Sequence, residues 1–351
     1  MGIFILYLKM IKPLTSLRFV FAFMVYLHHL QLKSGNATAQ MIYDFYFYEG
    51  HIGVSFFYIL SGFILSYTYF IRFQEGKVSK KKFWVARFAR VYPLHLVTLL
   101  IACIIALPHS WKIAFAQIAA NLTLSQSFFP FPKIYFSLNG PSWSISDEAF
   151  FYLMFPFLIL IKNVKVLIGL LFGLVILIVS YQVHIHQVVT FETFPYWFIK
   201  IFPFTRIADF IIGILLHRMS LLKKVESNLL EMGSVCLIIL FFTFHSSVPI
   251  QYRLSSYYWL PMAFLVYAFS FQAGFLSKAI SGSFFVLLGK ISFAFYLIHQ
   301  LVIRVYDSYN LNGNLLKTGC TLSASFLLAF ILHKAVEEPM NKWLKNKLTN
   351  T

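Results

Sequence analysis

Charged residues are scarce in this sequence. Of its 351 residues, 12% are charged, 59% are hydrophobic and 19% are aromatic. A soluble globular domain usually has about a quarter charged residues and under half apolar ones. The composition therefore excludes a soluble enzyme, a secreted domain and a disordered chain, and it predicts a polytopic membrane protein.

Cysteines are also few, and they lie far apart. The three are Cys103, Cys236 and Cys320, each inside an apolar run. They have the spacing neither of a metal site nor of a disulfide framework. We interpret them as small buried hydrophobic residues, and we expect no metal ion and no permanently bound cofactor.

Acidic residues are outnumbered: twelve Asp and Glu stand against 29 Lys and Arg, for a net charge of +17. In a soluble chain this excess would suggest nucleic-acid binding. Here the basic residues lie mostly in short segments between apolar runs, where they determine membrane topology, so no nucleic-acid partner is expected. Residues 1–13 lack the small-residue cleavage site of a signal peptide, and we expect them to be retained.

Long apolar runs are what the sequence does contain. A helix needs about 20 mainly apolar residues to cross a bilayer. On that length the expected spans are 14–32, 51–71, 91–108, 145–161, 166–183, 199–216, 229–247, 257–273, 284–303 and 318–336. The run 112–129 is shorter and carries Gln117, Asn121 and Gln126, so it is either an eleventh span or a segment at the outer surface.

Charge decides against the eleventh span. If 112–129 crossed, Lys162, Lys165 and Arg218 would move to the outer side, against the positive-inside rule. We therefore predict an all-α fold: a polytopic transmembrane bundle of about ten spans with a cytoplasmic N-terminus and C-terminus. Residues 1–351 are expected to form a single domain that spans the lipid bilayer of the inner (plasma) membrane many times.

The first span carries two ionisable residues that a membrane disfavours, Arg18 and His29. Their spacing places them on one helix face, about 16 Å apart, while His28 lies about 100° away. One interpretation is a functional stripe that faces the bundle interior. The other is an arginine that extends toward the membrane surface and a histidine satisfied at the interface.

A Gly-Pro break precedes a helix whose first turns contain Asp147 and Glu148. These carboxylates would stabilise the helix N-terminus, or one of them would meet His29 at the outer end of the bundle. A histidine oriented by a carboxylate is the unit of general-base catalysis on a hydroxyl. Candidates for lining an acceptor pocket are Trp143, Ser144, Ser146 and Asp147.

Three other pairs of ionisable residues stand out. Arg87 and Arg90 occupy neighbouring positions of one helix face. They would hold a phosphate or contact anionic lipid head groups. Arg206 and Asp209 are interpreted as an internal ion pair. By helical angle, Lys290 and His299 lie on opposite faces of their helix.

Six segments occur in a consistent order along the chain. They are Arg18-x10-His29, Gly50 to Phe63, Arg87-x-x-Arg90 followed by Val-Tyr-Pro, Gly140 to Glu148, Ser292 to His299, and Glu338-Pro339. Together they resemble the signature segments of the acyltransferase-3 family of membrane acyltransferases. The resemblance covers residues 14–343.

The resemblance implies transfer of an acyl group from cytoplasmic acyl-CoA to a hydroxyl of a glycan. The expected donor is acetyl-CoA, and the expected acceptor is a cell-surface polysaccharide or its lipid-linked precursor. By the same resemblance, His29 is the catalytic histidine, Arg18 its motif partner and Glu148 the motif carboxylate, while Arg87 and Arg90 bind CoA.

Three positions depart from the family pattern. Thr15, Ser55 and Ala149 stand where acidic residues are usual. A catalytically silent family member is therefore one alternative. A transporter or exporter of a lipid-type or sugar-type intermediate is another, because it would also need many spans and buried charges. No esterase-like domain follows the last motif, so we expect no fused second transfer step.

Overall fold

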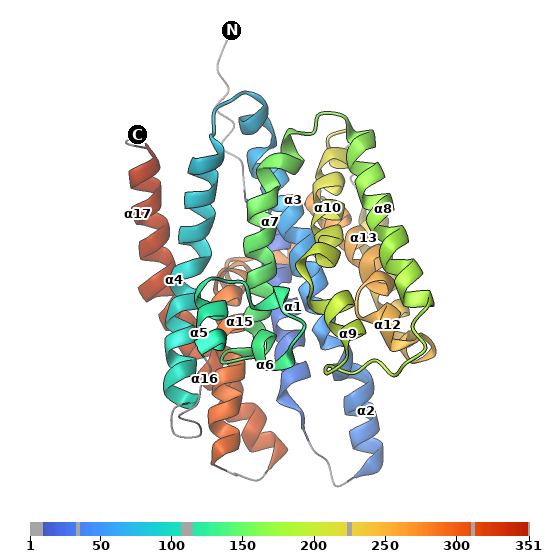
Figure 1. Ribbon diagram of the computed structural model, residues 1–351, viewed down its shortest axis with the longest axis vertical. Coiled ribbons are helices and arrows are strands. Elements are labelled where there is room, and N and C mark those ends of the chain that lie inside the picture. Colours follow the sequence, from blue (N-terminus) through green and yellow to red (C-terminus); the bar gives the residue numbers. More distant parts are fainter. Residues whose placement is uncertain (1–9, 33–35, 107–114, 223–226, 310–312, 350–351) are drawn as a thin grey trace.

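The computed structural model describes residues 10–32, 36–106, 115–222, 227–309 and 313–349. Of the described residues, 84% are helical and none is in a strand, so the all-α prediction is confirmed. Most of the segment expected to be retained at the N-terminus, residues 1–9, lies outside the described residues. The helices form one bundle, and the connections at residues 75–79 and 161–163 and the end of the last helix, α17 (Glu338–Thr349), lie at its upper end in Figure 1.

Each expected span coincides with one helix of the described chain. These helices are α1 (Lys12–Leu30), α3 (Gly53–Gln74), α4 (Lys80–Ala106), α7 (Trp143–Leu160), α8 (Val164–Val183), α10 (Pro203–Ser220), α11 (Asn228–Thr243), α13 (Trp259–Ser270), α15 (Ser283–Ser308) and α16 (Asn314–Leu332). Six segments of the described chain are long and apolar enough to cross a membrane on length and composition alone.

The remaining helices are short or lie at the ends of the bundle. They are α2 (Ala37–Phe47), α5 (Phe115–Leu122), α6 (Pro132–Tyr135), α9 (Phe194–Tyr196), α12 (Ile250–Arg253), α14 (Phe275–Ile280) and α17 (Glu338–Thr349). Helix α5 has eight residues, which is about 12 Å of helix and too short to cross a bilayer. The expectation that 112–129 does not cross agrees with this, although residues 112–114 lie outside the described chain.

Local chemistry explains several helix ends. Pro13 lies in the first turn of α1, where a missing N–H costs nothing, and Gln31 ends that helix in the left-handed conformation (φ 46°). The Asn163 side chain accepts a hydrogen bond from the Lys165 backbone N–H and caps α8. Helix α4 begins at Lys80, well before the expected residue 91, because Lys and Arg are good helix formers. The charged segment before residue 91 is therefore helical.

Small residues allow the central helices to approach closely. A side-chain carbon added to Gly62 on α3 would lie 2.0 Å from the Phe210 carbonyl oxygen on α10, and one added to Gly213 would lie 2.0 Å from the Ile59 carbonyl oxygen. A carbon added to Gly289 on α15 would lie 1.9 Å from the carbonyl oxygen of Thr15 on α1. Such glycine contacts are typical of membrane helix packing. These contacts hold α1 against α15, and α3 against α10.

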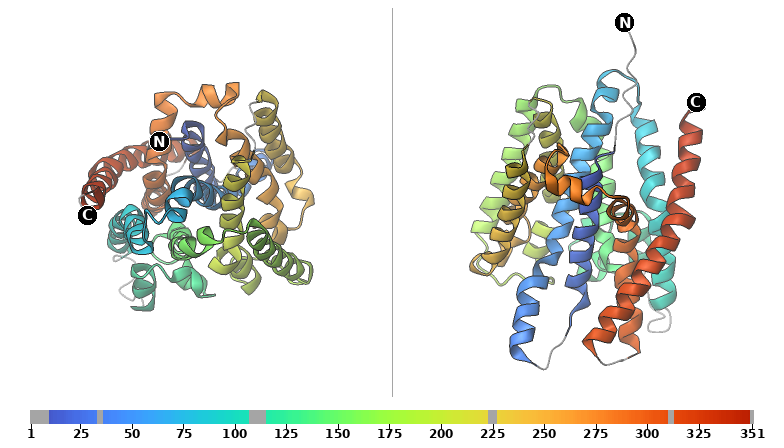
Figure 2. Two further views of the ribbon diagram at one scale, coloured as in Figure 1. Left: turned by 90° about the horizontal axis from the view of Figure 1, so that it is seen from above. Right: turned by 180° about the vertical axis from the view of Figure 1, so that it is seen from behind.

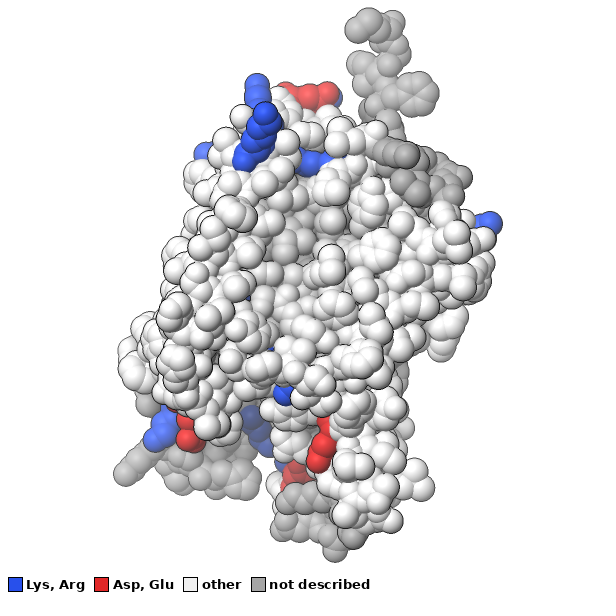
Figure 3. Space-filling model, turned by 90° about the vertical axis from the view of Figure 1, so that its right-hand side faces the viewer, with Lys and Arg blue, Asp and Glu red and all other residues white. Residues whose placement is uncertain are grey.

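The outer surface fits a membrane environment. Seen from above in Figure 2, α8 and α17 lie at opposite edges of the bundle. The outer face of α8 exposes Val166, Ile168, Phe172 and Ile176. On the face drawn in Figure 3, charged side chains gather toward the two ends and leave a broad band between them almost free of charge. Exposed apolar area of this extent is expected where lipid covers the protein.

Candidate functional site

A cavity of about 980 Å³ extends into the bundle between α1, α3, α4, α7 and α15. The exposed residues Arg72, Lys77 and Lys82 line it at the upper end of the bundle. Tyr58, Ser144 and Tyr296 line it deeper inside. The cavity therefore leads from the basic upper end of the bundle toward its centre.

Basic side chains outnumber acidic ones among the charged residues that line this cavity. Seven Lys and Arg residues line it against two glutamates; the basic ones are Arg18, Arg72, Lys77, Lys82, Arg87, Arg90 and Lys290. Arg87 donates a hydrogen bond to the Tyr69 hydroxyl (3.1 Å), and its guanidinium lies 5.4 Å from the centre of the Tyr69 ring. Among the described residues, Arg18 and Arg90 form no hydrogen bond or ion pair. Guanidinium groups left without partners in a cavity are suited to an anionic ligand.

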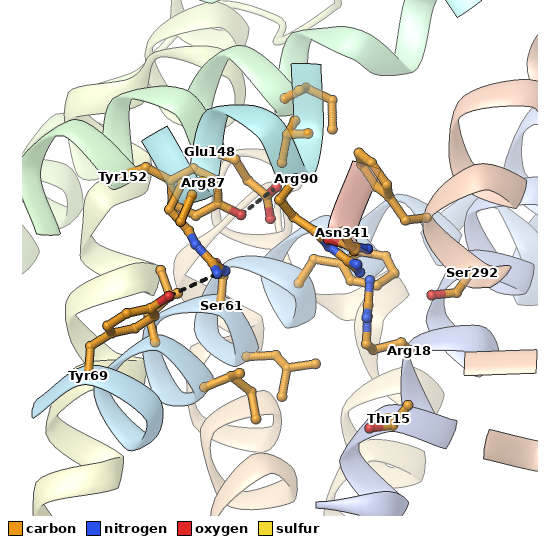
Figure 4. A pocket seen from close by; sticks show the side chains of 18 of the residues that line it. Thr15, Arg18, Ser61, Tyr69, Arg87, Arg90, Glu148, Tyr152, Ser292 and Asn341 are labelled. Carbon is orange, nitrogen blue, oxygen red and sulfur yellow. Dashed lines mark hydrogen bonds between the residues drawn. The ribbon is translucent and has the colours of Figure 1, made fainter. Parts of the chain in front are cut away.

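Glu148 lies among these arginines. Its carboxylate accepts a hydrogen bond from the Tyr152 hydroxyl (3.1 Å), and Figure 4 shows it facing the side of the cavity that holds Arg90 and Arg18. We expected Glu148 to share the depth of His29. No hydrogen bond joins these two residues in the described chain, and the neighbour of Glu148 along α1 is Arg18, about 16 Å of helix from His29.

Asp147 points to a different part of the bundle. It is fully buried, and its Oδ2 accepts a hydrogen bond from the Tyr58 hydroxyl (2.8 Å). Arg206 lies 5.3 Å from the Tyr58 ring centre, donates to Ser55 Oγ (2.7 Å) and pairs with Asp209 (3.3 Å). The predicted internal pair of Arg206 and Asp209 is confirmed. Ser55, at one of the departures from the family pattern, completes this buried network.

Of the four candidates for an acceptor pocket, Ser144 alone lines the cavity. Its Oγ lies 2.8 Å from the Tyr296 hydroxyl and donates to the Pro141 carbonyl oxygen (2.9 Å). Ser146 instead donates to the Leu124 carbonyl oxygen (2.6 Å), and Trp143 packs in an apolar cluster. Both support the start of α7 rather than the cavity wall.

Thr15 and Ala149 are the other two positions that depart from the family pattern, and neither forms an ion pair in the described chain. Thr15 lines the cavity, and its hydroxyl donates to the Ile11 carbonyl oxygen (3.1 Å). Ala149 packs against the apolar cluster formed by α1, α4 and α15. Neither residue replaces the missing carboxylate with another charge.

His29 lies beyond the deep end of the cavity and does not line it. Its Nδ1 lies 3.0 Å from Nε2 of His299 on α15, and its ring centre lies 5.1 Å from that of His28. The His28 ring in turn lies 5.6 Å from His51. Despite this group of imidazoles, no set of three or more potential metal ligands occurs in the described residues.

Tyr296 lies between the cavity and the group of histidines around His29. It lines the deep end of the cavity, and its ring centre lies 5.9 Å from that of His299. The helical spacing places His299 and Lys290 on opposite faces of α15 and by itself indicates no contact of His299 with His29 or Tyr296. The available signal was the segment Ser292 to His299, which contains both residues at a spacing of three, on one side of a helix.

Comparisons with known proteins agree on one family. A family model described as an acyltransferase domain matches residues 12–334. Acyltransferase MdmB of Streptomyces mycarofaciens is 30% identical over 95% of this chain and 92% of its own length. The peptidoglycan O-acetyltransferase OatA of Listeria monocytogenes is 26% identical over 84% of this chain, and a putative O-acetyltransferase of Staphylococcus aureus strain COL is 22% identical over the same share. The chain spans about half the length of these last two proteins, 51% and 53%. No solved structure matches.

Proposed function

Since the chain belongs to the acyltransferase-3 family and is an acyltransferase, we propose that it moves an acetyl group from cytoplasmic acetyl-CoA to a hydroxyl of a glycan. The observation that carries this proposal is the cavity of about 980 Å³ with seven basic and two acidic lining residues. Coenzyme A presents several phosphates on a long flexible arm. A deep cavity with a cationic entrance is suited to hold the phosphates at its entrance and the thioester at its inner end.

Topology supports a cytoplasmic entrance. The cavity is lined at one end by Arg72, Lys77 and Lys82, which lie in and beside the connection between α3 and α4. Basic connections lie on the cytoplasmic side of membrane proteins, and CoA thioesters occur in the cytoplasm. We therefore propose ten crossings with both termini cytoplasmic, in the plasma (inner) membrane.

In this proposal Arg87 and Arg90 bind the CoA phosphates, while Arg18 and Glu148 act further along the same cavity. Arg18 would contact the donor, and Glu148 would limit the repulsion among the three guanidinium groups. In this proposal Glu148 does not orient His29. The carboxylate of Glu148 accepts a hydrogen bond from Tyr152, and its cationic neighbours are the cavity arginines.

His29 would act as the general base of the transfer. The acceptor oxygen attacks the thioester carbonyl carbon while His29 takes the hydroxyl proton. The new C–O bond forms, the C–S bond breaks, and the proton passes from the imidazolium to the departing CoA sulfur. The acceptor would approach His29 from the side away from the cavity, so that donor and acceptor meet near Tyr296 and Ser144.

The acceptor class is proposed from the relatives. One relative is named for peptidoglycan O-acetylation, and a glycan offers many hydroxyl groups outside the cytoplasm. A surface polysaccharide or its lipid-linked precursor would reach His29 from the outer side without crossing the membrane.

Purified protein with acetyl-CoA tests the proposal. We expect free CoA thiol to form only when a glycan acceptor is present, with a matching acetyl mass increase on the glycan. Movement of the glycan across sealed vesicles without thiol release would contradict the proposal and favour the transporter alternative. Absence of both thiol release and glycan movement would favour the catalytically silent alternative.

A further inference from the structure

His299 is a fully buried histidine whose two ring nitrogens both have partners. It is 0% exposed. Its Nδ1 lies 3.2 Å from the Phe295 carbonyl oxygen, and its Nε2 lies 3.0 Å from Nδ1 of His29. The partner of each nitrogen determines which nitrogen carries a proton.

The chain of hydrogen bonds has one consistent direction. A carbonyl oxygen only accepts, so the Nδ1 of His299 must carry its proton. A neutral imidazole has one N–H, which leaves a lone pair on Nε2 of His299. That lone pair accepts a hydrogen bond from the Nδ1–H of His29. The proton of neutral His29 is then on Nδ1, and its Nε2 carries a free lone pair.

We propose that His299 is a positioning residue that holds His29 in the tautomer whose Nε2 can remove a proton from the acceptor hydroxyl. This inference rests on the proposed function of His29 as the general base. A base oriented by a third group is the usual arrangement in nucleophilic catalysis. Here the orienting group is a neutral imidazole, and the described residues place no carboxylate within hydrogen-bond distance of His29.

Packing keeps His299 in place for this role. Its ring stacks on Phe295 with 6.0 Å between the ring centres, and the Tyr26 ring lies edge-on at 6.2 Å. The Tyr26 hydroxyl is itself held by Thr321 on α16, at 2.8 Å. The ring can therefore turn little without disturbing three helices.

The same arrangement serves the protonated state of His29. After His29 takes a proton on Nε2, both of its nitrogens carry hydrogen. The Nδ1–H still donates to His299, and a hydrogen bond from a charged donor is stronger than one from a neutral donor. His299 therefore stabilises the imidazolium that forms as the acceptor oxygen attacks.

Three substitutions of His299 separate this role from simple packing. His299→Leu removes both hydrogen bonds. His299→Asn places an amide near the Phe295 carbonyl but is too short to reach His29. His299→Gln places an amide oxygen near the former Nε2 position, where it accepts from His29. We expect about a 10–100-fold lower kcat for the Leu and Asn variants, an unchanged KM for acetyl-CoA, and recovery of most of kcat in the Gln variant.

Equal activity of the Asn and Gln variants, or wild-type kcat in the Leu variant, would overturn the inference. His29→Ala is measured beside them to separate the two proposals. An active His29→Ala variant contradicts the proposed function itself. An inactive His29→Ala variant beside fully active His299 variants contradicts only the role of His299.

A measurement on the unsubstituted protein covers the case in which the variants do not fold. Nitrogen-15 NMR of histidine-labelled protein distinguishes N–H from lone-pair nitrogens, and the His29 signals are assigned as those absent from His29→Ala. We expect an N–H at Nδ1 and a lone pair at Nε2 of His29. The opposite tautomer would overturn the inference whatever the variants show.

Discussion

The Tyr296 hydroxyl lies 2.8 Å from Ser144 Oγ and joins α15 to the start of α7 at the deep end of the cavity. On one side of this contact is the cavity lined by arginines. On the other side are His299 and His29. The contact therefore lies between the proposed donor site and the proposed base, and in the proposed reaction the thioester comes close to it before transfer.

Replacing Tyr296 should allow acetyl-CoA to be hydrolysed when no acceptor is present. In Tyr296→Ala the ring that closes the deep end is gone, so water would reach a bound thioester. We expect CoA thiol release without acceptor to rise severalfold, measured with a thiol reagent. Tyr296→Phe keeps the ring and loses only the hydroxyl, and it should keep this background low. An equal background in both variants would show that the ring is no barrier.

Arg87→Ala should weaken the binding of acetyl-CoA. Loss of a charge-assisted hydrogen bond costs about 1.5–3 kcal/mol, which corresponds to roughly 10–150-fold in KM for the donor. Arg87→Lys should fall between wild type and the Ala variant, because Lys keeps the charge but not the paired donors. The matched control is Lys165→Ala, which removes an exposed charge outside the cavity. The same loss in that control would point to a general surface effect.

The buried pair of Arg206 and Asp209 should be needed for stability. Asp209 is 0% exposed and Arg206 is 2% exposed. Removal of one partner leaves an uncompensated buried charge, so Asp209→Ala should lower the free energy of unfolding by about 3–5 kcal/mol. The combined variant R206M/D209L should be more stable than D209A alone. Thermal unfolding of the purified protein measures both, and an unchanged midpoint for D209A would contradict this account.

The close approach of α3 and α10 depends on glycine. Gly213→Ala would place a carbon 2.0 Å from the Ile59 carbonyl oxygen, and overpacking of this kind costs about 1–3 kcal/mol. Gly169 on α8 has no atom within 4 Å of an added carbon, so Gly169→Ala should not destabilise the protein. We expect a lower unfolding temperature for the first variant only. Equal temperatures for the two would mean that the helices can separate without cost.

The helices were predictable because the apolar runs are long and the charged segments between them are short. The start of α4 was not, because the segment from Lys80 to Arg90 is too polar for a span yet favourable for a helix. The bounds of α7 were close to those expected, since the Gly-Pro break precedes that helix in the sequence.

The site was only partly predictable. Local spacing placed Arg87 and Arg90 on one face, and the structure has both lining the cavity. The contact of His29 with His299 joins residues 270 positions apart, and no local pattern indicates such a pairing. The neighbours of Glu148 were not predictable from its place near a helix start, because the packing of α7 against α3 and α4 decides which side chains it meets.

The central claim is that His29 carries the proton transfer of the acyltransferase reaction. The most direct measurement is acetyl transfer to a glycan by purified His29→Ala protein, with CoA binding measured on the same sample and His186→Ala as an exposed-histidine control. We predict a loss of about 100- to 10,000-fold in kcat, unchanged CoA binding, and full activity in the control. Wild-type transfer by His29→Ala would contradict the account.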